Sequence, residues 1–287
     1  MKQENNAGHF LPIQLKSDGD FATVLRHGAH VTGYTPAGQK PVLWTSREAL
    51  FAPSKAIRGG IPVIWPWFGG HPADSSKSSH GIARKMVWQS IAINADELIE
   101  NTAQTKLQLL PDEQSHPDVD GTFQTTLLVT VGAQLAVSLT TKNVGEKPFD
   151  YSAALHSYFA VGDARQIKIK GLDGRPYIDQ LDGNRRKVQS GPIVIDREVD
   201  NIYLETADTV EIHDPVYGRV IEVSKEGSLS TVVWNPWIEK AARMADFGDD
   251  EYLEMVCVET CNTADDSQHL LPGESHTLTT QISCRPL

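Results

Sequence analysis

Residues 123–142 read FQTTLLVTVGAQLAVSLTTK and carry the clearest structural signal in the chain. Two stretches rich in Leu, Val and Thr, Phe123–Val131 and Gln134–Lys142, are separated by Gly132 and Ala133. In the second stretch large apolar residues alternate with small or polar ones, as in a strand with one covered face. Two such strands joined by a short glycine-containing turn predict an antiparallel β-hairpin.

The rest of the chain repeats this pattern of short strands and turns. Further strands are predicted within residues 10–48 and at Met86–Asn94, Leu107–Leu110, Phe149–Val161, Gln166–Lys170, Ile193–Ile195, Thr209–His213, Arg219–Ser224, Ser230–Trp234, Leu253–Asn262 and Ser275–Cys284. The one helix candidate is Ile238–Met244, Pro111–Gly121 is predicted as an exposed loop, and Arg185–Lys187 as a solvated turn. Many strands without alternating helices favour a large antiparallel β-sandwich over βαβ units. Because no repeat or long linker divides the sequence, we predict an all-β fold with a single domain over residues 1–287.

Composition limits the classes of partner. The 287 residues are 40% hydrophobic, enough for a sizeable core, and carry a formal net charge of −11. A nucleic-acid partner is not expected, because neutralising its phosphates needs a basic surface. The chain shows neither the apolar core of a signal peptide nor a run approaching a membrane span. Three cysteines without CxxC spacing favour a reducing compartment, so we expect a cytoplasmic protein with no membrane partner. The oligomeric state stays open, with a monomer favoured.

A second stretch is typical of a pocket rim. Residues 58–70 read RGGIPVIWPWFGG, and a polar run and the segment HGIAR at 80–84 follow. The two prolines argue against a regular central strand, and the apolar residues between them do not suit a solvated loop. Arg58 and Arg84 offer planar guanidinium groups for an anionic ligand, and the two tryptophans offer flat faces for a sugar ring. A folded core loop with two surface arginines explains the same residues about as well.

One histidine lies on the less apolar face of a predicted strand. Successive side chains of Phe149–Val161 must point to opposite faces, and His156 shares its face with Asp150, Ser152, Ala154 and Tyr158. Such a face could form the floor of a ligand groove. The strand by itself favours a solvent-facing or hydrogen-bonded structural histidine.

One carboxylate lies on an apolar face. Within Leu253–Asn262, Glu259 shares its face with Met255, Cys257 and Cys261. A carboxylate there is costly unless it is paired or neutralised, which makes Glu259 a candidate acid or base. A position at the strand end, where the face opens to water, accounts for the pattern equally well.

Several catalytic signatures are missing from the sequence. No histidine pair has zincin spacing, no phosphate-binding glycine loop or GxGxxG follows a strand, and no GxSxG nucleophile elbow occurs. We therefore infer no metal, no nucleotide cofactor and no serine nucleophile.

Six segments occur together in a fixed order. They are RGGIPVIWPWFG at 58–69, SHGIAR at 79–84, LHSYFAVGD at 155–163, DNIY at 200–203, VVWNPW at 232–237 and CVETCN at 257–262. In this combination the chain, from about Val42 to its end, resembles the hexose-6-phosphate mutarotases, or glucose-6-phosphate 1-epimerases, of the aldose 1-epimerase superfamily. The resemblance implies a galactose mutarotase-type β-sandwich with a sugar phosphate bound in a groove on one large sheet, and no cofactor.

The resemblance also implies roles for individual residues. His156 and Glu259 would be the catalytic acid and base, which open the hexose ring and close it on the other face of C1. Arg58, Arg84 and Asp200 would contact the substrate, with both arginines near its phosphate.

Two further positions belong to the same motifs. His80 would line the pocket. Ser79 stands where relatives have a longer glutamine that contacts the substrate, so this contact is in question. Thr260 and Cys261 stand where relatives often have Pro-Gly.

Other functions remain compatible with the sequence. A mutarotase for unphosphorylated aldoses would use the same acid and base, and the two arginines would then be structural. A sugar-binding protein without turnover could share the fold. A glycosidase would need two carboxylates flanking one bond, and Asp200 with Glu259 is the only pair that the sequence offers.

Overall fold

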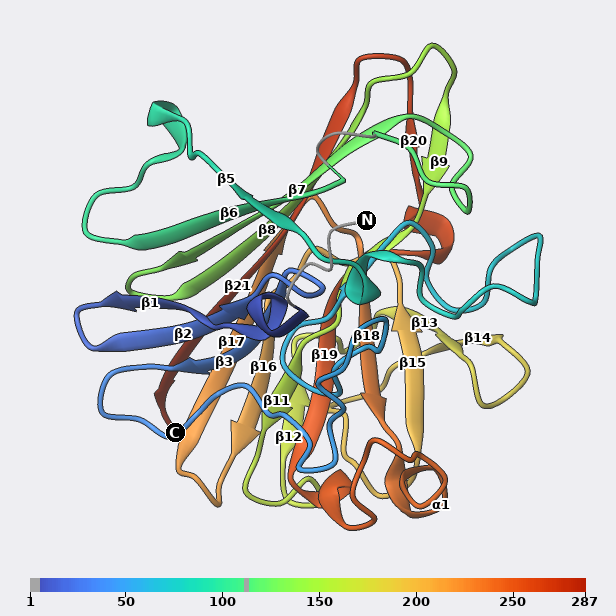
Figure 1. The fold of residues 1–287 in the computed structure, drawn as a ribbon. Coiled ribbons are helices and arrows are strands. Elements are labelled where there is room, and N and C mark those ends of the chain that lie inside the picture. Colours follow the sequence, from blue (N-terminus) through green and yellow to red (C-terminus); the bar gives the residue numbers. More distant parts are fainter. Residues whose placement is uncertain (1–5, 111–113) are drawn as a thin grey trace.

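The computed structural model describes residues 6–110 and 114–287, and its main feature is a pair of eight-stranded sheets (Figure 1). Sheet I has the strand order β14-β13-β15-β18-β19-β10-β4, and β11 also pairs with β19. Sheet II has the order β12-β16-β17-β21-β8-β7-β6-β5. All pairings within both sheets are antiparallel, so the all-β antiparallel fold predicted from the sequence is confirmed.

The strands of sheet I are on average shorter than those of sheet II. Sheet I consists of β4 (Val63–Ile64), β10 (Ala153–Leu155), β11 (Tyr158–Ala160), β13 (Pro176–Asp179), β14 (Arg185–Val188), β15 (Val199–Tyr203), β18 (Ser230–Asn235) and β19 (Met255–Asn262). Sheet II consists of β5 (Gln89–Ile91), β6 (Ala103–Leu109), β7 (Phe123–Val131), β8 (Leu135–Asn143), β12 (Lys168–Lys170), β16 (Val210–Asp214), β17 (Arg219–Glu226) and β21 (Ser275–Pro286). Two smaller sheets contain β1 (Ile13–Ser17), β2 (Asp20–Leu25) and β3 (His30–Thr35), and β9 (Phe149–Tyr151) with β20 (Gln268–Leu270).

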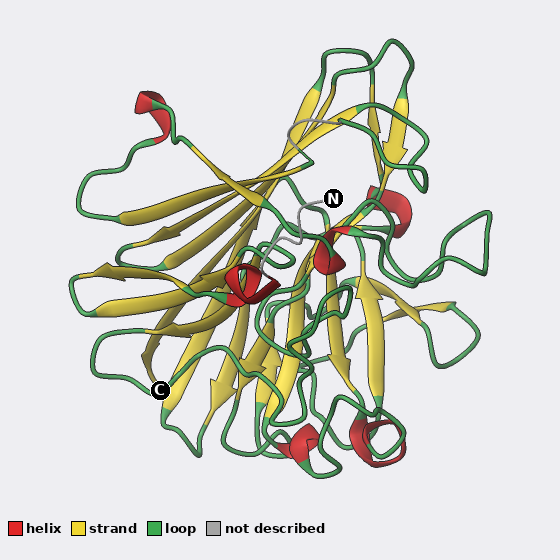
Figure 2. Cartoon of the chain, in the orientation of Figure 1, coloured by secondary structure: helices red, strands yellow, loops and turns green. Residues whose placement is uncertain are grey.

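Helices are few and short in the described residues (Figure 2). They are α1 (Trp237–Ala241) and the 3-10 helices η1 (Asn6–Phe10), η2 (Ala83–Lys85), η3 (Ala95–Glu97), η4 (Glu251–Leu253) and η5 (Ala264–Asp266). Helix α1 begins one residue before the predicted Ile238–Met244 and ends three residues earlier. In the part of the chain that the structure describes, no helix has the length and apolar character needed to cross a membrane.

The predicted hairpin forms as β7 and β8. The register pairs Val131 with Leu135 and Phe123 with Asn143, so the turn falls at residues 132–134. Leu127 and Val129 of β7 face Leu139 and Val137 of β8, and all four are buried. The alternation read from the sequence therefore reflects one face packed on the core.

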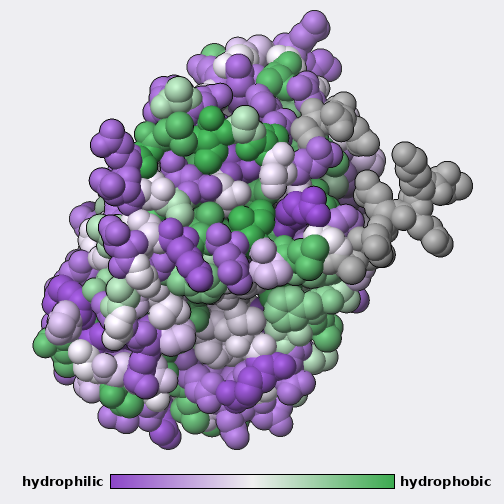
Figure 3. Space-filling view, turned by 60° about the vertical axis from the view of Figure 1, so that its left-hand side comes forward, coloured by the Kyte–Doolittle hydropathy of each residue, from purple (hydrophilic) through white to green (hydrophobic). Residues whose placement is uncertain are grey.

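The core lies between the two large sheets. One hydrophobic cluster joins buried residues of sheet I, such as Val233 and Val258, to residues of sheet II, such as Leu127 and Ile282. On the face shown in Figure 3, by contrast, hydrophobic side chains form separate areas among hydrophilic ones. Burial of apolar area between the sheets, at about 25 cal/mol per Å², is the main stabilising contribution to such a sandwich.

The long strand predicted at Phe149–Val161 is interrupted. It divides into β9, β10 and β11, and β9 pairs with β20 outside sheet I. Between β10 and β11, the N–H of Ser157 donates to the carbonyl of Leu155 at 2.9 Å instead of to a neighbouring strand. Both β10 and β11 nevertheless pair with β19, so the interruption places His156 beside the middle of that strand.

Several predicted boundaries were wrong. Ile193–Ile195 is no strand and only Ile193 forms a bridge. Arg185–Lys187 is not a turn but belongs to β14, an edge strand whose charged residues lack apolar alternation. Strands β13 and β15 were not predicted, and β5 covers only part of Met86–Asn94. Residues 111–113 of the predicted loop lie outside the described residues.

His30 at the start of β3 is fully buried and uncharged. Its Nε2 donates to the carbonyl of Gly59 at 2.7 Å, while its Nδ1 has no hydrogen-bond partner among the described residues. The pKa of His30 is lowered to about 4, mainly by burial and in addition by His27 and Arg84, while the hydrogen bond to Gly59 opposes this. A folded protein that excludes a proton from this site loses stability when the pH falls.

We predict that the free energy of unfolding decreases between pH 6.5 and pH 4. The unfolded chain binds a proton at His30 near pH 6.5, whereas the folded chain binds it only near pH 4, so the loss can reach about 3 kcal/mol at this site. Urea unfolding across this range measures the loss. His30→Gln keeps a donor for Gly59 and should reduce the loss, whereas the exposed control His269→Gln should not. If the free energy of unfolding of His30→Gln decreased as much as that of the wild type, the decrease would be due to other groups.

Candidate active site

A pocket of about 340 Å³ opens on sheet I. It is lined by Arg58, Phe68, Gly69, Ser79, His80, Arg84, His156, Tyr158, Gln180, Asp200, Val232, Trp234, Lys240, Met244 and Glu259. These residues come from segments that are up to about 200 positions apart in the sequence, so only the fold brings them together. All seven site residues predicted from the sequence line this one pocket.

The strand order of sheet I sets the layout of the pocket. Asp200 lies on β15, Trp234 and Val232 lie on β18, Glu259 lies on β19, and His156 follows β10. Asp200 pairs with Trp234, and Val232 pairs with Glu259. Neighbouring strands are ~4.8 Å apart, so Asp200 and Glu259 are separated by two strand spacings.

Glu259 and His156 form a buried pair. Their Oε1 and Nε2 atoms are 3.3 Å apart, and the two residues are 1% and 8% exposed. The second polar atoms of the two side chains, Oε2 of Glu259 and Nδ1 of His156, are buried and have no hydrogen-bond partner within the described ranges. Such atoms are costly to leave unsatisfied, and a polar ligand group in the pocket can satisfy them.

Burial favours the uncharged forms of both His156 and Glu259. Desolvation raises the pKa of Glu259 well above its ordinary value, and Asp200 raises it further, while Arg84 opposes this. Desolvation lowers the pKa of His156 well below its ordinary value, and the neighbouring His80 and arginines act in the same direction. The uncharged forms are favoured, with the single proton of the pair on Glu259.

Rings around His156 fix its orientation. The imidazole stacks on the Tyr158 ring at 4.7 Å with an interplanar angle of 9°. The rings of Trp234 and His80 are nearly perpendicular to it, with ring centroids 6.2 and 6.0 Å away. Among these rings, Tyr158 and Trp234 were not singled out from the sequence as site residues.

The two arginines differ in their surroundings. Nε and Nη2 of Arg58 donate to the Asp246 carboxylate at 3.3 and 3.2 Å, and Nη1 donates to the Tyr158 hydroxyl at 2.9 Å. Burial alone would lower the pKa of Arg58, but Tyr158 and Asp246 raise it above its ordinary value. Asp246 was not predicted from the sequence.

Arg84 has no such carboxylate partner among the described residues. Its Nη2 donates to the backbone carbonyl of Ser79 at 2.9 Å, and its Nε is buried without a partner in residues 6–110 and 114–287. Burial lowers the pKa of Arg84 to about 10, and the positive charge of Arg58 contributes. Arg84 therefore remains a cation at neutral pH whose guanidinium can accept an anionic ligand.

Ser79 and His80 form part of the pocket rim. The Ser79 hydroxyl donates to the carbonyl of Gly69 at 3.1 Å, so its short side chain is used locally. His80 accepts a hydrogen bond from the Gly69 N–H at 3.3 Å, and burial lowers the pKa of its ring to about 3. Gly81 follows with φ of +69°, and a Cβ there would lie 2.0 Å from the carbonyl oxygen of Trp65, so only glycine fits.

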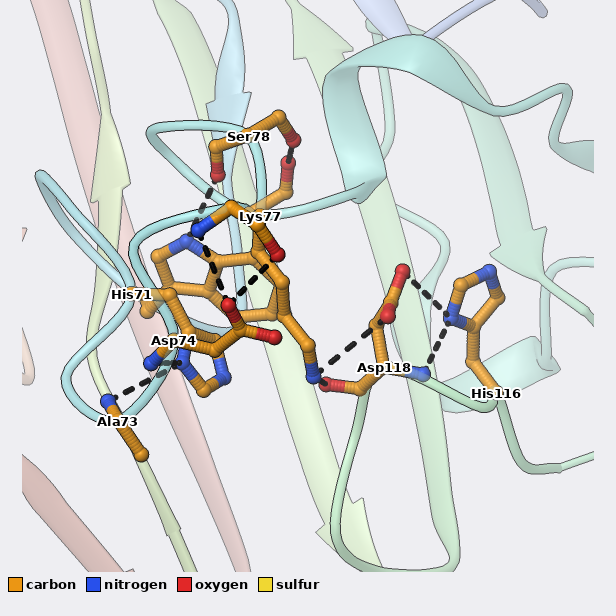
Figure 4. A network of polar contacts seen from close by, with 10 residues as sticks. His71, Ala73, Asp74, Lys77, Ser78, His116 and Asp118 are labelled. Carbon is orange, nitrogen blue, oxygen red and sulfur yellow. Dashed lines mark hydrogen bonds and ion pairs between the residues drawn. The ribbon is translucent and has the colours of Figure 1, made fainter.

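The rim loop is tied to a neighbouring loop by a polar network (Figure 4). Lys77 donates to the backbone carbonyl of Asp118 at 3.2 Å and forms an ion pair with its carboxylate at 3.5 Å. Trp67 donates its indole N–H to the carbonyl of Ser78 at 3.0 Å and meets His71 edge to face at 4.6 Å. These contacts hold the segment that ends at Ser79.

Two explanations were left open for Trp65 and Trp67, and the structure supports the core loop rather than stacking on a sugar. Trp65 is fully buried and Trp67 is 6% exposed, and both pack in the hydrophobic cluster rather than lining the pocket. The pocket instead uses Trp234 and Phe68. The motif VVWNPW contained Trp234, but its position on the pocket face required the register of β18.

Gln180 and Lys240 line the pocket and were also missed. Gln180 follows β13, which was not predicted, and Lys240 lies on α1. Gln180 donates to Oδ1 of Asp200 at 2.5 Å, and Lys240 forms an ion pair with its Oδ2 at 3.5 Å. Among the described residues, no three His, Cys, Asp or Glu side chains are arranged to hold a metal ion.

Comparison with known proteins gives a consistent result. Residues 13–283 match the family described as aldose 1-epimerase. A "putative glucose-6-phosphate 1-epimerase" of Cenchrus ciliaris is 36% identical over 261 residues, which cover 88% of this chain and 78% of that protein. A protein of the same name from Escherichia coli strain K12 is 34% identical over 240 residues, covering 83% and 79%.

Solved structures agree with this match. The structure described as a "putative mutarotase" from Salmonella typhimurium has a TM-score of 0.85 and 31% sequence identity, covering 96% of this chain and 90% of that one. A galactose mutarotase-like protein from Clostridium acetobutylicum has a TM-score of 0.74 at 14% identity, covering 96% and 95%, and shares the fold.

We predict that Glu259→Gln becomes progressively more stable than the wild type as the pH rises. The folded-state pKa of Glu259 is raised, so its contribution to stability is complete below the unfolded value of about 4.5 and is lost as the pH rises through the folded value. The amide side chain of the variant does not ionise, so the variant does not lose stability in this way as the pH rises. Urea unfolding of both proteins between pH 5 and 9 measures the difference, and a constant difference over this range would contradict a buried, neutral Glu259.

Proposed function

Because the chain belongs to the aldose 1-epimerase family and is therefore a sugar isomerase, we propose that it interconverts the α and β anomers of a hexose 6-phosphate, with glucose 6-phosphate as the expected substrate. One observation carries the proposal. The buried His156–Glu259 pair shares a pocket with two arginines, one of which lacks a carboxylate partner among the described residues. A proton-transfer pair and an anion site therefore lie within the reach of one small molecule.

Ring opening needs one base and one acid. Glu259 takes the proton of the C1 hydroxyl, the C1–O5 bond breaks as C1 becomes an aldehyde, and His156 gives a proton to O5. After rotation about the C1–C2 bond, the hydroxyl on C5 attacks the other face of the aldehyde and both protons return. A positioned acid–base pair contributes roughly 10²–10⁴ in rate.

The pair already holds the one proton that this cycle needs. Burial favours neutral His156 with a protonated Glu259, and the 3.3 Å between Nε2 and Oε1 allows direct proton transfer. Transfer to His156 gives the ionised carboxylate and protonated imidazole that ring opening requires. Because the total charge of the pair is unchanged, the transfer adds no net charge to the buried site.

The arginines are proposed to bind the 6-phosphate. The chain has a formal net charge of −11, so a dianionic substrate needs local positive charge. Arg84 has a buried Nε without a partner in the described part of the chain, and Arg58 keeps two N–H groups beyond those bonded to Asp246 and Tyr158. Relatives named for glucose 6-phosphate support this substrate class.

A mutarotase for unphosphorylated aldoses is the second candidate, and one observation favours it. Asp246 places a carboxylate against Arg58 and lowers the positive potential that a phosphate would meet. The Arg84 guanidinium, which has no carboxylate partner among the described residues, and the names of the relatives favour the phosphorylated substrate over this alternative.

The domain organisation and the cellular location of the protein are also proposals. We propose that residues 1–287 act as a single catalytic domain, which the shared hydrophobic cluster of both sheets supports. We also propose a cytoplasmic location, supported by three unpaired cysteines.

We expect His156→Ala and Glu259→Gln each to lower kcat for anomer exchange of glucose 6-phosphate by at least about 100-fold, because each removes half of the proton-transfer pair. The double variant should lose little more than either single variant, since the two act as a unit. Exchange NMR measures kcat, and His269→Ala on the exposed surface is the control. Near-normal kcat in either single variant, with the fold intact, would refute the assignment.

We expect Arg84→Ala to raise KM for glucose 6-phosphate by roughly tenfold to a hundredfold, because it removes charge-assisted hydrogen bonds to the phosphate. Arg58→Ala should act in the same direction. Exchange of unphosphorylated glucose should change far less, and Arg84→Lys should rescue only partly because an ammonium lacks the planar fork.

Arg185→Ala is the matched control, because this arginine is exposed on β14 and does not line the pocket. If both pocket variants discriminate between glucose 6-phosphate and glucose as the wild type does, these arginines do not recognise the phosphate. The unphosphorylated aldose then becomes the favoured substrate.

A further inference from the structure

Asp200 is held on both sides by residues of the pocket. Oδ1 accepts a hydrogen bond from Nε2 of Gln180 at 2.5 Å, and Nζ of Lys240 lies 3.5 Å from Oδ2. Lys240 is itself fixed by Glu198 at 2.9 Å and lies 5.7 Å from the centre of the Trp234 ring. Burial raises the pKa of Asp200, and the Lys240 ammonium and the Gln180 hydrogen bond limit this rise. We call Gln180, Asp200 and Lys240 the Asp200 cluster.

The Asp200 cluster keeps capacity for further hydrogen bonds. Each carboxylate oxygen of Asp200 has a second lone pair, the Lys240 ammonium has a third proton, and the Gln180 carbonyl accepts no hydrogen bond from another described residue. Donors and acceptors therefore lie side by side at the pocket wall. Two neighbouring hydroxyl groups, one donating to Asp200 and one accepting from Lys240, match this arrangement.

The strand order places the Asp200 cluster at one end of the pocket. Across sheet I, β13 and β15 lie on one side of β19, and β10 and β4 lie on the other. Glu259 on β19 interacts electrostatically with both Asp200 and Arg84, and Asp200 interacts in addition with Lys240 and Glu198. Asp200 is two strand spacings from Glu259, or ~10 Å across the sheet.

A hexose 6-phosphate bound between these ends has a defined orientation. If the 6-phosphate lies at Arg58 and Arg84 and C1 lies at the His156–Glu259 pair, as the proposed function requires, the ring atoms farthest from the phosphate face the Asp200 cluster. In a pyranose, C2 is opposite C5, which carries the phosphorylated C6, and C3 is next to C2. The hydroxyls on C2 and C3 are therefore the neighbouring pair that reaches Asp200.

We propose that Lys240 and Gln180 are specificity-determining residues, which together with Asp200 bind the hydroxyl groups on C2 and C3 of the sugar. This inference rests on the proposed function for the orientation of the substrate. It predicts that the pocket binds hexose 6-phosphates with hydroxyl groups on both C2 and C3 more tightly than the 2-deoxy and 3-deoxy sugars.

Binding measurements test this independently of turnover. Titration calorimetry gives Kd for glucose 6-phosphate, 2-deoxyglucose 6-phosphate and 3-deoxyglucose 6-phosphate. Lys240→Met should raise Kd for glucose 6-phosphate by roughly tenfold to a hundredfold, because a charged hydrogen bond is lost. It should raise Kd for at least one of the two deoxy sugars far less. Lys240→Arg keeps a cationic donor and should restore part of the difference. Gln180→Leu should repeat the pattern of Lys240→Met more weakly, since Gln180 is neutral.

A matched control separates recognition from folding. Lys142→Met replaces an exposed lysine on β8 in sheet II and should leave all three Kd values and the thermal unfolding midpoint at wild-type levels. Lys240→Met should also keep the wild-type unfolding midpoint within a few degrees. If Lys240 contributed only to stability, Lys240→Met would raise Kd for all three sugar phosphates by the same factor.

The outcomes separate this inference from the proposed function. The inference is overturned if Lys240→Met raises Kd for all three sugar phosphates by the same factor, or changes none of them. This holds even if the wild type exchanges anomers. Weakening that depends on the C2 or C3 hydroxyl supports the inference, and absence of anomer exchange in the same protein would then contradict only the proposed catalysis. A wild type that binds none of the three sugar phosphates overturns both.

Discussion

The site depends on one constraint, which is the burial of the Glu259 carboxyl group on a central strand beside His156. Every residue of β19 is buried, so a charge on Glu259 is penalised by desolvation and its pKa rises. The same burial lowers the pKa of His156. An isolated buried carboxylate would be strongly destabilising, whereas a pair that shares one proton can remain neutral. The interruption between β10 and β11 matters for this reason, because it brings the imidazole to 3.3 Å from the carboxyl group.

The charged groups around the pair are arranged by strand order. Arg58 and Arg84 belong to the rim segments before β4 and around η2, next to β10, while Asp200 and Lys240 come from β15 and α1 on the other side of β19. The pocket consequently has a cationic end and an end that carries both an acidic and a basic side chain, with the His156–Glu259 pair between them. A substrate with an anionic group on one side of its reactive carbon and hydroxyls on the other is complementary to this layout.

Much of the architecture could be predicted from local pattern, and much of the site could not. The alternation in residues 123–142 specified β7 and β8 because each strand buries one face. Strands β13 and β15 are short and partly polar, and β14 consists mostly of charged residues, so none carries a periodic apolar signal. Motif resemblance located His156 and Glu259, but the strand patterns alone left structural explanations open for both. Gln180 and Lys240 meet Asp200 only through the pairing of β13 with β15 and the placement of α1, which no local pattern encodes.

The most direct test of the proposed catalysis is exchange NMR on equilibrium mixtures of sugar anomers with the wild-type protein. At catalytic protein concentrations, the anomeric protons of glucose 6-phosphate should show exchange between α and β forms well above the rate without protein, and those of glucose should show much less at the same sugar concentration. No acceleration for glucose 6-phosphate would contradict the proposed catalysis. Equal acceleration of both sugars would contradict the proposed recognition of the phosphate.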